Sequence, residues 1–162
     1  VVVEDYSRAL LPWKNNLQNV LFGMRRNHSL STASKIEKAR EILAAVGLAG
    51  FEERHPWQLS GGMQQRVAIA RGIAAESRLL LLDEPTDNLD IDSSEALENA
   101  LDGFEGTVLS VSHDRTFLAK FDRFIMITDD GEVYALPDYE VAMQGLAAPA
   151  ELSNVRLAKP LT

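Results

Sequence analysis

The sequence predicts an α/β domain with a mainly parallel sheet flanked by helices. Two short runs, Leu79–Leu82 and Thr107–Ser112, are typical of strands covered on both faces. Apolar residues recur at helical spacing behind Ser31 and again over Met63–Ala75. Because strands that alternate with helices usually pair in parallel, the middle of the chain favours an α/β fold.

Capping residues mark several of the expected helices. Ser31–Ser34 offer N-cap side chains for one helix, and Gly47 is placed to end it. The spacing of Asp92-Ser93-Ser94-Glu95 is that of a capping box and predicts a helix that reaches about Leu101. The other expected elements are a strand at Val1–Val3, short helices at Leu17–Met24 and Asp114–Lys120, a hairpin of Arg123–Thr128 and Glu132–Leu136 around Asp129-Asp130-Gly131, and a final helix from about Asp138.

Composition excludes several classes of function. The 162 residues contain no cysteine, which excludes disulfides, cysteine nucleophiles and thiolate metal sites. The net charge of −8 opposes a nucleic-acid-binding surface as the main function, because phosphate contacts need clustered Lys and Arg. No apolar run approaches the roughly 20 residues that span a bilayer, so we expect any membrane link to run through a partner protein.

Two adjacent carboxylates, Asp83 and Glu84, follow the first apolar run. Ligands of open α/β sheets bind beyond the carboxyl ends of the strands. One carboxylate there can hold Mg²⁺, and the next can orient or deprotonate an attacking water. Taken alone, the pair is explained equally well as solvated acids at a strand end.

Two further features suggest phosphate chemistry. His113 follows the second strand, where its imidazole could bond a γ-phosphate, although histidine also serves as an ordinary strand-end residue. Ser60-Gly61-Gly62 directly precedes a helix, whose free N–H groups and positive dipole end attract anions. A plain glycine-containing helix entry is the alternative for that segment.

Together these segments resemble the ATP-binding cassette (ABC) family. The resemblance covers roughly residues 1–146, and the order and spacing of the motifs fit throughout. The matching segments are Leu59–Gln64 with the signature sequence, Leu79–Glu84 with the Walker B motif, Asp87–Asp90 with the D-loop, and His113 with the switch histidine.

The resemblance implies a partial P-loop NTPase fold with a helical subdomain and a C-terminal β-hairpin. It implies that Glu84 is the general base, that Asp83 supports Mg²⁺ and that His113 contacts the γ-phosphate. Ser60, Gly61 and Gly62 would bind the γ-phosphate of an ATP held by a second, facing ABC domain. The other implied nucleotide-binding positions are Gln64, Asp90 and Glu4, where Glu4 stands in the place of the family's Q-loop glutamine.

One family motif does not occur. No Gly-x-x-x-x-Gly-Lys-Ser/Thr loop, which would hold the nucleotide phosphates, is present in the sequence. We therefore expect that the chain begins in mid-domain and is inactive alone. The expected organisation is a truncated ABC ATPase domain over residues 1–147, with a helical subdomain at about 13–75, core strands at about 76–136 and a loose tail at 148–162.

The motifs point to two branches of the family. Leu10–Trp13 and Met63–Arg66 resemble importer ATPases of the nitrate, sulfonate and taurine type, whereas Phe104–Thr107 and Ser112–Leu118 resemble the ribosome-associated ABC-F group. The leading hypothesis is an importer subunit that binds ATP and Mg²⁺. It would pair with a second ABC domain and with permease subunits, in the cytoplasm at the inner face of the membrane. The alternatives are an ABC-F ATPase, for which nucleic-acid contact would be expected, and a non-catalytic interaction fragment.

Overall fold

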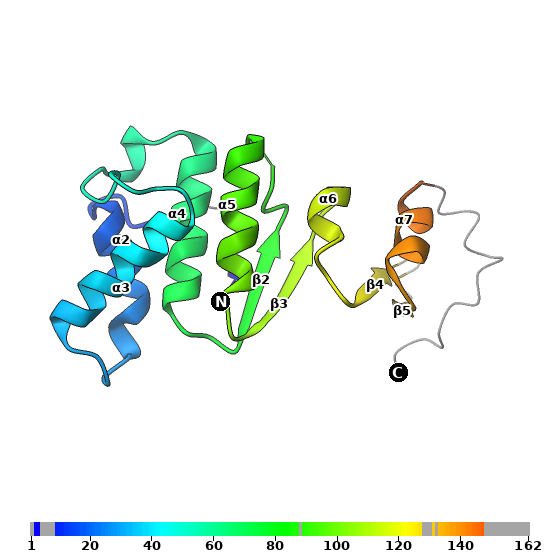
Figure 1. The fold of residues 1–162 in the computed structure, drawn as a ribbon, viewed down its shortest axis with the longest axis horizontal. Coiled ribbons are helices and arrows are strands. Elements are labelled where there is room, and N and C mark those ends of the chain that lie inside the picture. The colour runs from blue at the N-terminus through cyan, green and yellow to red at the C-terminus, as the bar shows by residue number, and fades with distance from the viewer. Residues whose placement is uncertain (1, 4–8, 88, 128–130, 132, 148–162) are drawn as a thin grey trace. The chain divides into compact units, whose positions relative to one another are not determined.

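The computed structural model describes residues 2–3, 9–87, 89–127, 131 and 133–147, and it divides into two compact units at Val111. Figure 1 shows the fold. The first unit contains β1 (Val2–Val3), α2 (Asn16–Gly23), the 3-10 helix η1 (Met24–Arg26), α3 (Thr32–Ala45), the 3-10 helix η2 (Pro56–Gln58), α4 (Gly61–Ala74), β2 (Leu79–Asp83), α5 (Ile91–Asp102) and β3 (Thr107–Val111). The second unit contains α6 (Arg115–Leu118), β4 (Phe124–Ile127), β5 (Val133–Leu136) and α7 (Tyr139–Ala147).

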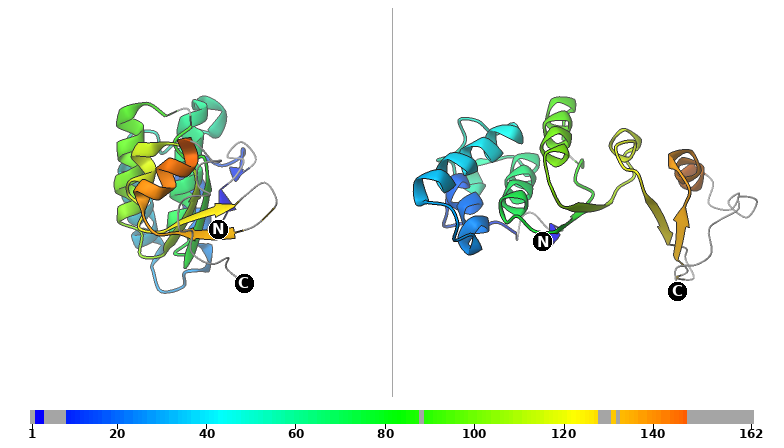
Figure 2. Two further views of the ribbon diagram at one scale, coloured as in Figure 1. Left: turned by 90° about the vertical axis from the view of Figure 1, so that its right-hand side faces the viewer. Right: turned by 60° about the horizontal axis from the view of Figure 1, so that its bottom comes forward.

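The sheet of the first unit has the order β1-β2-β3, and both pairings are parallel. Val2 is opposite Leu81, and Asp83 is opposite Val111, so β2 and β3 end at the same edge. Figure 2 shows that α4 and α5 lie on the same side of β2 and β3. The parallel α/β arrangement confirms the fold class predicted from the sequence.

The core lies between β2 and these helices. Leu80 and Leu82 point to the helical side and are fully buried, together with Val67 and Ile69 of α4 and Leu97 of α5. Full burial of one such aliphatic side chain contributes about 1.5–3 kcal/mol to folding. The same core extends through Leu43 of α3, so the sheet and the helical segment share one hydrophobic cluster.

The opposite face of the sheet differs from the sequence prediction. Leu79 is 48% exposed, Leu109 45% and Val111 58%, so the prediction that these strands are covered on both faces is wrong for the described residues. Successive strand residues point to opposite faces, and α4 and α5 cover only one of them. An apolar composition therefore identified the strands correctly but did not identify what covers them.

The cap of α3 confirms the sequence prediction, whereas the cap of α5 corrects it. Ser31 caps α3 and accepts a hydrogen bond from the Ser34 N–H at 3.1 Å. The N-cap of α5 is Asp90, not Asp92, because the Asp90 carboxylate accepts the Ser93 N–H at 2.9 Å. Hydrogen bonds from the side chain and backbone of Ser93 lower the pKa of the Asp90 carboxyl below its ordinary value.

The second unit contains the predicted hairpin. Strands β4 and β5 pair antiparallel, with Phe124 opposite Leu136 and Ile127 opposite Val133. Gly131 has a φ of +85°, the left-handed conformation for which a turn glycine is suited, whereas residues 128–130 and 132 lie outside the described residues. The predicted loose tail at 148–162 also lies outside them.

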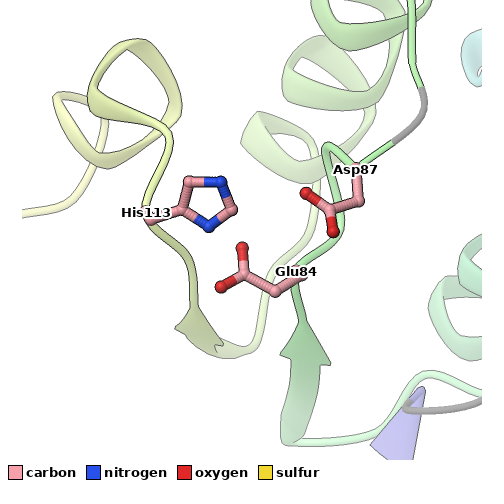
Figure 3. A group of neighbouring side chains, drawn as sticks. All are labelled: Glu84, Asp87 and His113. Carbon is pink, nitrogen blue, oxygen red and sulfur yellow. The ribbon is translucent and has the colours of Figure 1, made fainter.

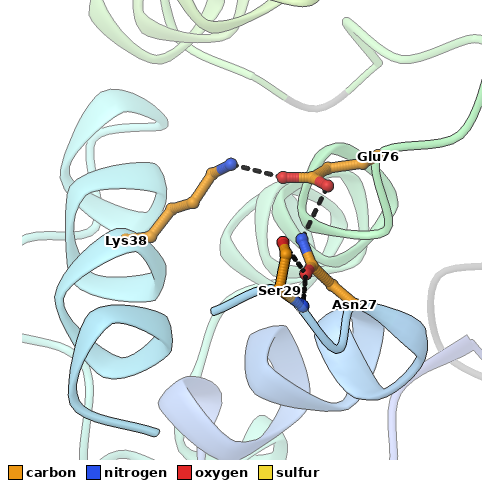
Figure 4. Close-up of polar contacts among 4 residues, drawn as sticks. All are labelled: Asn27, Ser29, Lys38 and Glu76. Atoms are coloured by element: carbon orange, nitrogen blue, oxygen red, sulfur yellow. Dashed lines mark hydrogen bonds and ion pairs between the residues drawn. The ribbon is translucent and has the colours of Figure 1, made fainter. Parts of the chain in front are cut away.

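A small polar cluster connects the end of α4 to α3 and η1. The Glu76 carboxylate accepts hydrogen bonds from the Lys38 ammonium and from the Asn27 amide, the latter at 2.8 Å (Figure 4). Glu76 has a φ of +48°, a backbone conformation that a non-glycine residue rarely adopts. The two bonds anchor its side chain at this turn. The ion pair to Lys38 is the main cause that lowers the pKa of Glu76 below 4.5.

We expect Glu76→Gln to lower the free energy of unfolding by a few tenths to about 1 kcal/mol at neutral pH, since both partners are partly exposed. The folded pKa lies below the unfolded one, so the stabilisation is complete above the unfolded pKa and is lost as pH falls through the folded pKa. Urea titrations at pH 7 and below pH 4, each at low and high salt, measure it. Glu37→Gln on α3 is the matched charge control, and equal effects of the two variants would contradict the prediction.

Candidate functional site

The candidate site begins where β2 ends. Asp83 is the last residue of β2 and is exposed, and Glu84 follows in a half-buried position. The Glu84 N–H donates to the Val111 carbonyl at 2.9 Å, which extends the β2–β3 ladder by one bond past the strand. Figure 3 shows Glu84 and Asp87 projecting from the turn that follows β2.

The backbone of this acidic turn, residues 83–87, has an unusual conformation. Glu84 has a φ of +40°, in the left-handed region that costs a non-glycine residue about 1–2 kcal/mol. Its carbonyl accepts hydrogen bonds from the Asp87 N–H at 3.2 Å and from the Gln65 side chain at 3.0 Å. Pro85 and Thr86 between them are buried. The surrounding structure therefore determines a conformation that the residue alone disfavours, as is common at functional sites.

The donors of the acidic turn fit a divalent cation. Asp83, Glu84 and Asp87 offer carboxylate oxygens within one short segment, and Mg²⁺ prefers oxygen ligands. Asp83 and Asp87 are exposed, so a cation and its waters can reach them. A base beside such an ion could remove a proton from an attacking water.

The entry to α4 forms a second candidate surface. Ser60 is the N-cap, and its hydroxyl oxygen accepts the Met63 N–H at 3.3 Å. Ser60 and Gly61 are exposed, while Gly62 is buried. Gln64 donates its side-chain amide back to the Leu59 carbonyl at 3.3 Å. The exposed N-terminus of the helix leaves room for an anion to approach the backbone closely.

Asp90 is connected to α4 through electrostatics rather than through a direct bond. Burial lowers the pKa of the Arg66 guanidinium, and the nearby Asp90 carboxylate partly offsets that effect. Arg66 also donates to the Val46 carbonyl at 2.9 Å, at the end of α3. Asp90 thus caps α5 and faces a buried cation, a structural role that the D-loop resemblance did not indicate.

Two predicted site residues lie outside this unit or outside the described residues. Glu4 is not among the described residues. His113 opens the second unit, two residues after the end of β3 (Figure 3), and is exposed. That His113 and Glu84 serve one site therefore stays a prediction.

Sequence reasoning missed Gln65. It lies on α4, is 5% exposed and donates to the carbonyl of Glu84, which is 19 residues away in sequence. Gln65 stands between two polar residues, a pattern that predicts a solvent-exposed position. The one contrary signal is that Gln65 lies four residues before the buried Ile69, on the same side of α4.

Comparisons with known proteins identify the family that the chain is similar to. The family model described as ABC transporter matches residues 2–87. A taurine import ATP-binding protein of Pseudomonas syringae pv. tomato is 41% identical over 140 residues, which cover 82% of this chain and 52% of the relative. An antibiotic resistance protein of Mycobacteroides abscessus is 52% identical over 97 residues, which cover 60% of this chain and 18% of the relative.

A solved structure supports the same fold. A bacterial ABC transporter cassette, determined as a dimer, superposes with a TM-score of 0.66 at 33% identity and covers 76% of this chain and 56% of that one. The same cassette has also been solved with ADP and phosphate bound.

The parallel sheet with its acidic turn defines the chain as part of a P-loop NTPase fold. Since the family model matches more than half of its residues, the chain belongs to the ABC transporter family. It spans about half the length of the curated relatives it matches over most of its own length.

Proposed function

We propose that this chain is part of the ATP-binding and ATP-hydrolysing subunit of an ABC importer, which couples hydrolysis to solute uptake. The acidic turn after β2 carries the proposal, because it holds Glu84 at the carboxyl edge of a parallel sheet in a strained conformation. Similarity to a taurine import ATP-binding protein supports the transport role.

Each residue of the site has a proposed task. Glu84 accepts the proton of the water that attacks the γ-phosphate, and His113 donates a hydrogen bond to that phosphate. Asp83 holds Mg²⁺, which when bound neutralises the phosphate charge that develops during transfer. At the N-terminus of α4, Ser60 and the glycines after it contact the nucleotide of a partner domain.

The proposed partners are a second ABC ATPase domain in a head-to-tail pair and transmembrane permease subunits. Among the described residues, the helices are all too short or too polar to cross a bilayer. From the proposed importer role, we propose a cytoplasmic location, peripheral at the inner face of the membrane through the permease. Gln64, Asp90 and Glu4 would complete the nucleotide-facing surface.

A second candidate function is supported by one comparison. The antibiotic resistance protein shares 97 residues that make up only 18% of its length, which is compatible with the long tandem arrangement of ABC-F ATPases. The two functions differ in where the protein binds. To test this, the chain is fused behind a segment that carries a Gly-x-x-x-x-Gly-Lys-Ser/Thr loop, which gives a loop-bearing fusion. We expect this fusion to sediment with membranes only when a taurine-type permease is co-expressed. Sedimentation with ribosomes instead would favour ABC-F.

We expect the chain by itself to release no phosphate from Mg-ATP above background, because it contains no phosphate-binding loop or loop lysine. Steady-state phosphate release with purified chain tests this. Glu84→Gln is the control, since it separates true turnover from a contaminating ATPase. Turnover that Glu84→Gln abolishes would contradict the expectation, whereas inactivity of the loop-bearing fusion would favour the non-catalytic interaction fragment.

A further inference from the structure

One buried contact joins α4 to the acidic turn that contains Glu84. The Gln65 side chain is 5% exposed and donates its amide N–H to the Glu84 carbonyl at 3.0 Å. Its other polar atom, Oε1, has no hydrogen-bond partner in the part of the chain that the structure describes. Burial of a side-chain amide whose oxygen makes no hydrogen bond costs free energy. The bond from its nitrogen to the Glu84 carbonyl offsets part of that cost.

The contact acts on the strained residue itself. A peptide plane rotates as a unit, so a donor to the Glu84 carbonyl restrains the ψ angle of Glu84 and therefore the backbone from which its side chain projects. Two backbone hydrogen bonds also involve Glu84: its N–H donates to the Val111 carbonyl, and its carbonyl accepts from the Asp87 N–H. Of these contacts, the one from Gln65 comes from a helix rather than from the turn or the sheet.

We propose that Gln65 is a positioning residue that holds the backbone from which the Glu84 carboxylate projects, an inference that rests on the proposed role of Glu84 as the base. Gln65 does not touch the reacting atoms. It stabilises the left-handed conformation of Glu84, so that the base meets the attacking water without reorganisation. Misplacement of a catalytic group by about 1 Å can lower a rate about a hundredfold.

A matched control exists elsewhere in the same unit. Asn16 is fully buried, donates its amide to the Phe51 carbonyl at 2.7 Å, and has an Oδ1 without a partner among the described residues. Asn16→Leu removes a side-chain amide of the same kind from the first residue of α2, remote in sequence from the acidic turn. Gln65→Met is the corresponding near-isosteric change, and Gln65→Glu is a polar alternative if the methionine variant does not fold.

The first arm measures the backbone of the 162-residue chain by hydrogen exchange. We expect Gln65→Met to raise exchange at the Glu84, Asp87 and Leu89 amides about tenfold relative to Asn16→Leu, after correction for global stability measured in urea. Gln65→Glu should do the same at a pH high enough to ionise the buried carboxyl, because an ionised carboxylate cannot donate to a carbonyl. Equal exchange at those amides in Gln65→Met and in Asn16→Leu would overturn the proposal.

The second arm measures ATP hydrolysis by the loop-bearing fusion. We expect Gln65→Met to lower kcat about tenfold to a hundredfold with the KM for ATP unchanged, and Asn16→Leu to change neither. A rise in KM at constant kcat would overturn the proposal. If the fusion with Gln65 intact shows no hydrolysis that depends on Glu84, the proposed function fails, and the exchange arm still decides whether Gln65 holds the turn.

Discussion

Glu84→Gln in the loop-bearing fusion is expected to reduce ATP hydrolysis by about two to four orders of magnitude. An amide cannot accept the proton of the attacking water, and general-base catalysis typically contributes a factor of that size. The glutamine side chain has nearly the same shape, and the backbone bonds from Glu84 to Val111 and Asp87 are retained. The turn should therefore keep its conformation and ATP should still bind.

The same variant should accumulate as an ATP-bound dimer, since the nucleotide between two domains is no longer consumed. Single-turnover phosphate release gives the rate, and light scattering with and without ATP gives the oligomeric state. Glu95→Gln on α5 is the control, because it removes the same charge from an exposed helical position. Loss of ATP affinity in Glu84→Gln, or retention of more than about a tenth of the rate, would contradict Glu84 as the base.

The sequence was sufficient to predict most helices and strands of the described part of the chain. The helix behind Ser31 begins and ends as expected, because N-cap hydroxyls and a C-terminal glycine are local signals. The cap of α5 was misplaced by two residues, because Asp90 and Asp92 both have the side chain that a cap needs. Only the bond from the Ser93 N–H distinguishes the two carboxylates.

Burial and long-range contacts were not predictable in the same way. Apolar runs identified β2 and β3, but whether helices cover one face or both depends on tertiary packing. The site showed a similar division. Glu84 was predicted from its place after an apolar strand, whereas its left-handed backbone and the bond from Gln65 depend on how α4 packs beside β2.

Ser60→Arg in the loop-bearing fusion is expected to impair hydrolysis about a hundredfold or more, while ATP binding to the same subunit is retained. The arginine replaces the hydroxyl that caps α4 and fills the space that an anion would enter. In the proposed head-to-tail pair, Ser60 at the N-terminus of α4 contacts the nucleotide of the partner domain. The defect should therefore arise at the partner's nucleotide.

Mixed dimers separate the two assignments. In a head-to-tail pair, each site combines Glu84 of one subunit with Ser60 of the other. Placing Glu84→Gln and Ser60→Arg on opposite subunits should disable one site twice and leave about half the hydrolysis, because the second site keeps both groups. Placing both changes on one subunit should disable both sites. If Ser60 instead served the nucleotide of its own subunit, the two outcomes would be exchanged. The proposed assignment of Ser60 to the partner's nucleotide would then be wrong.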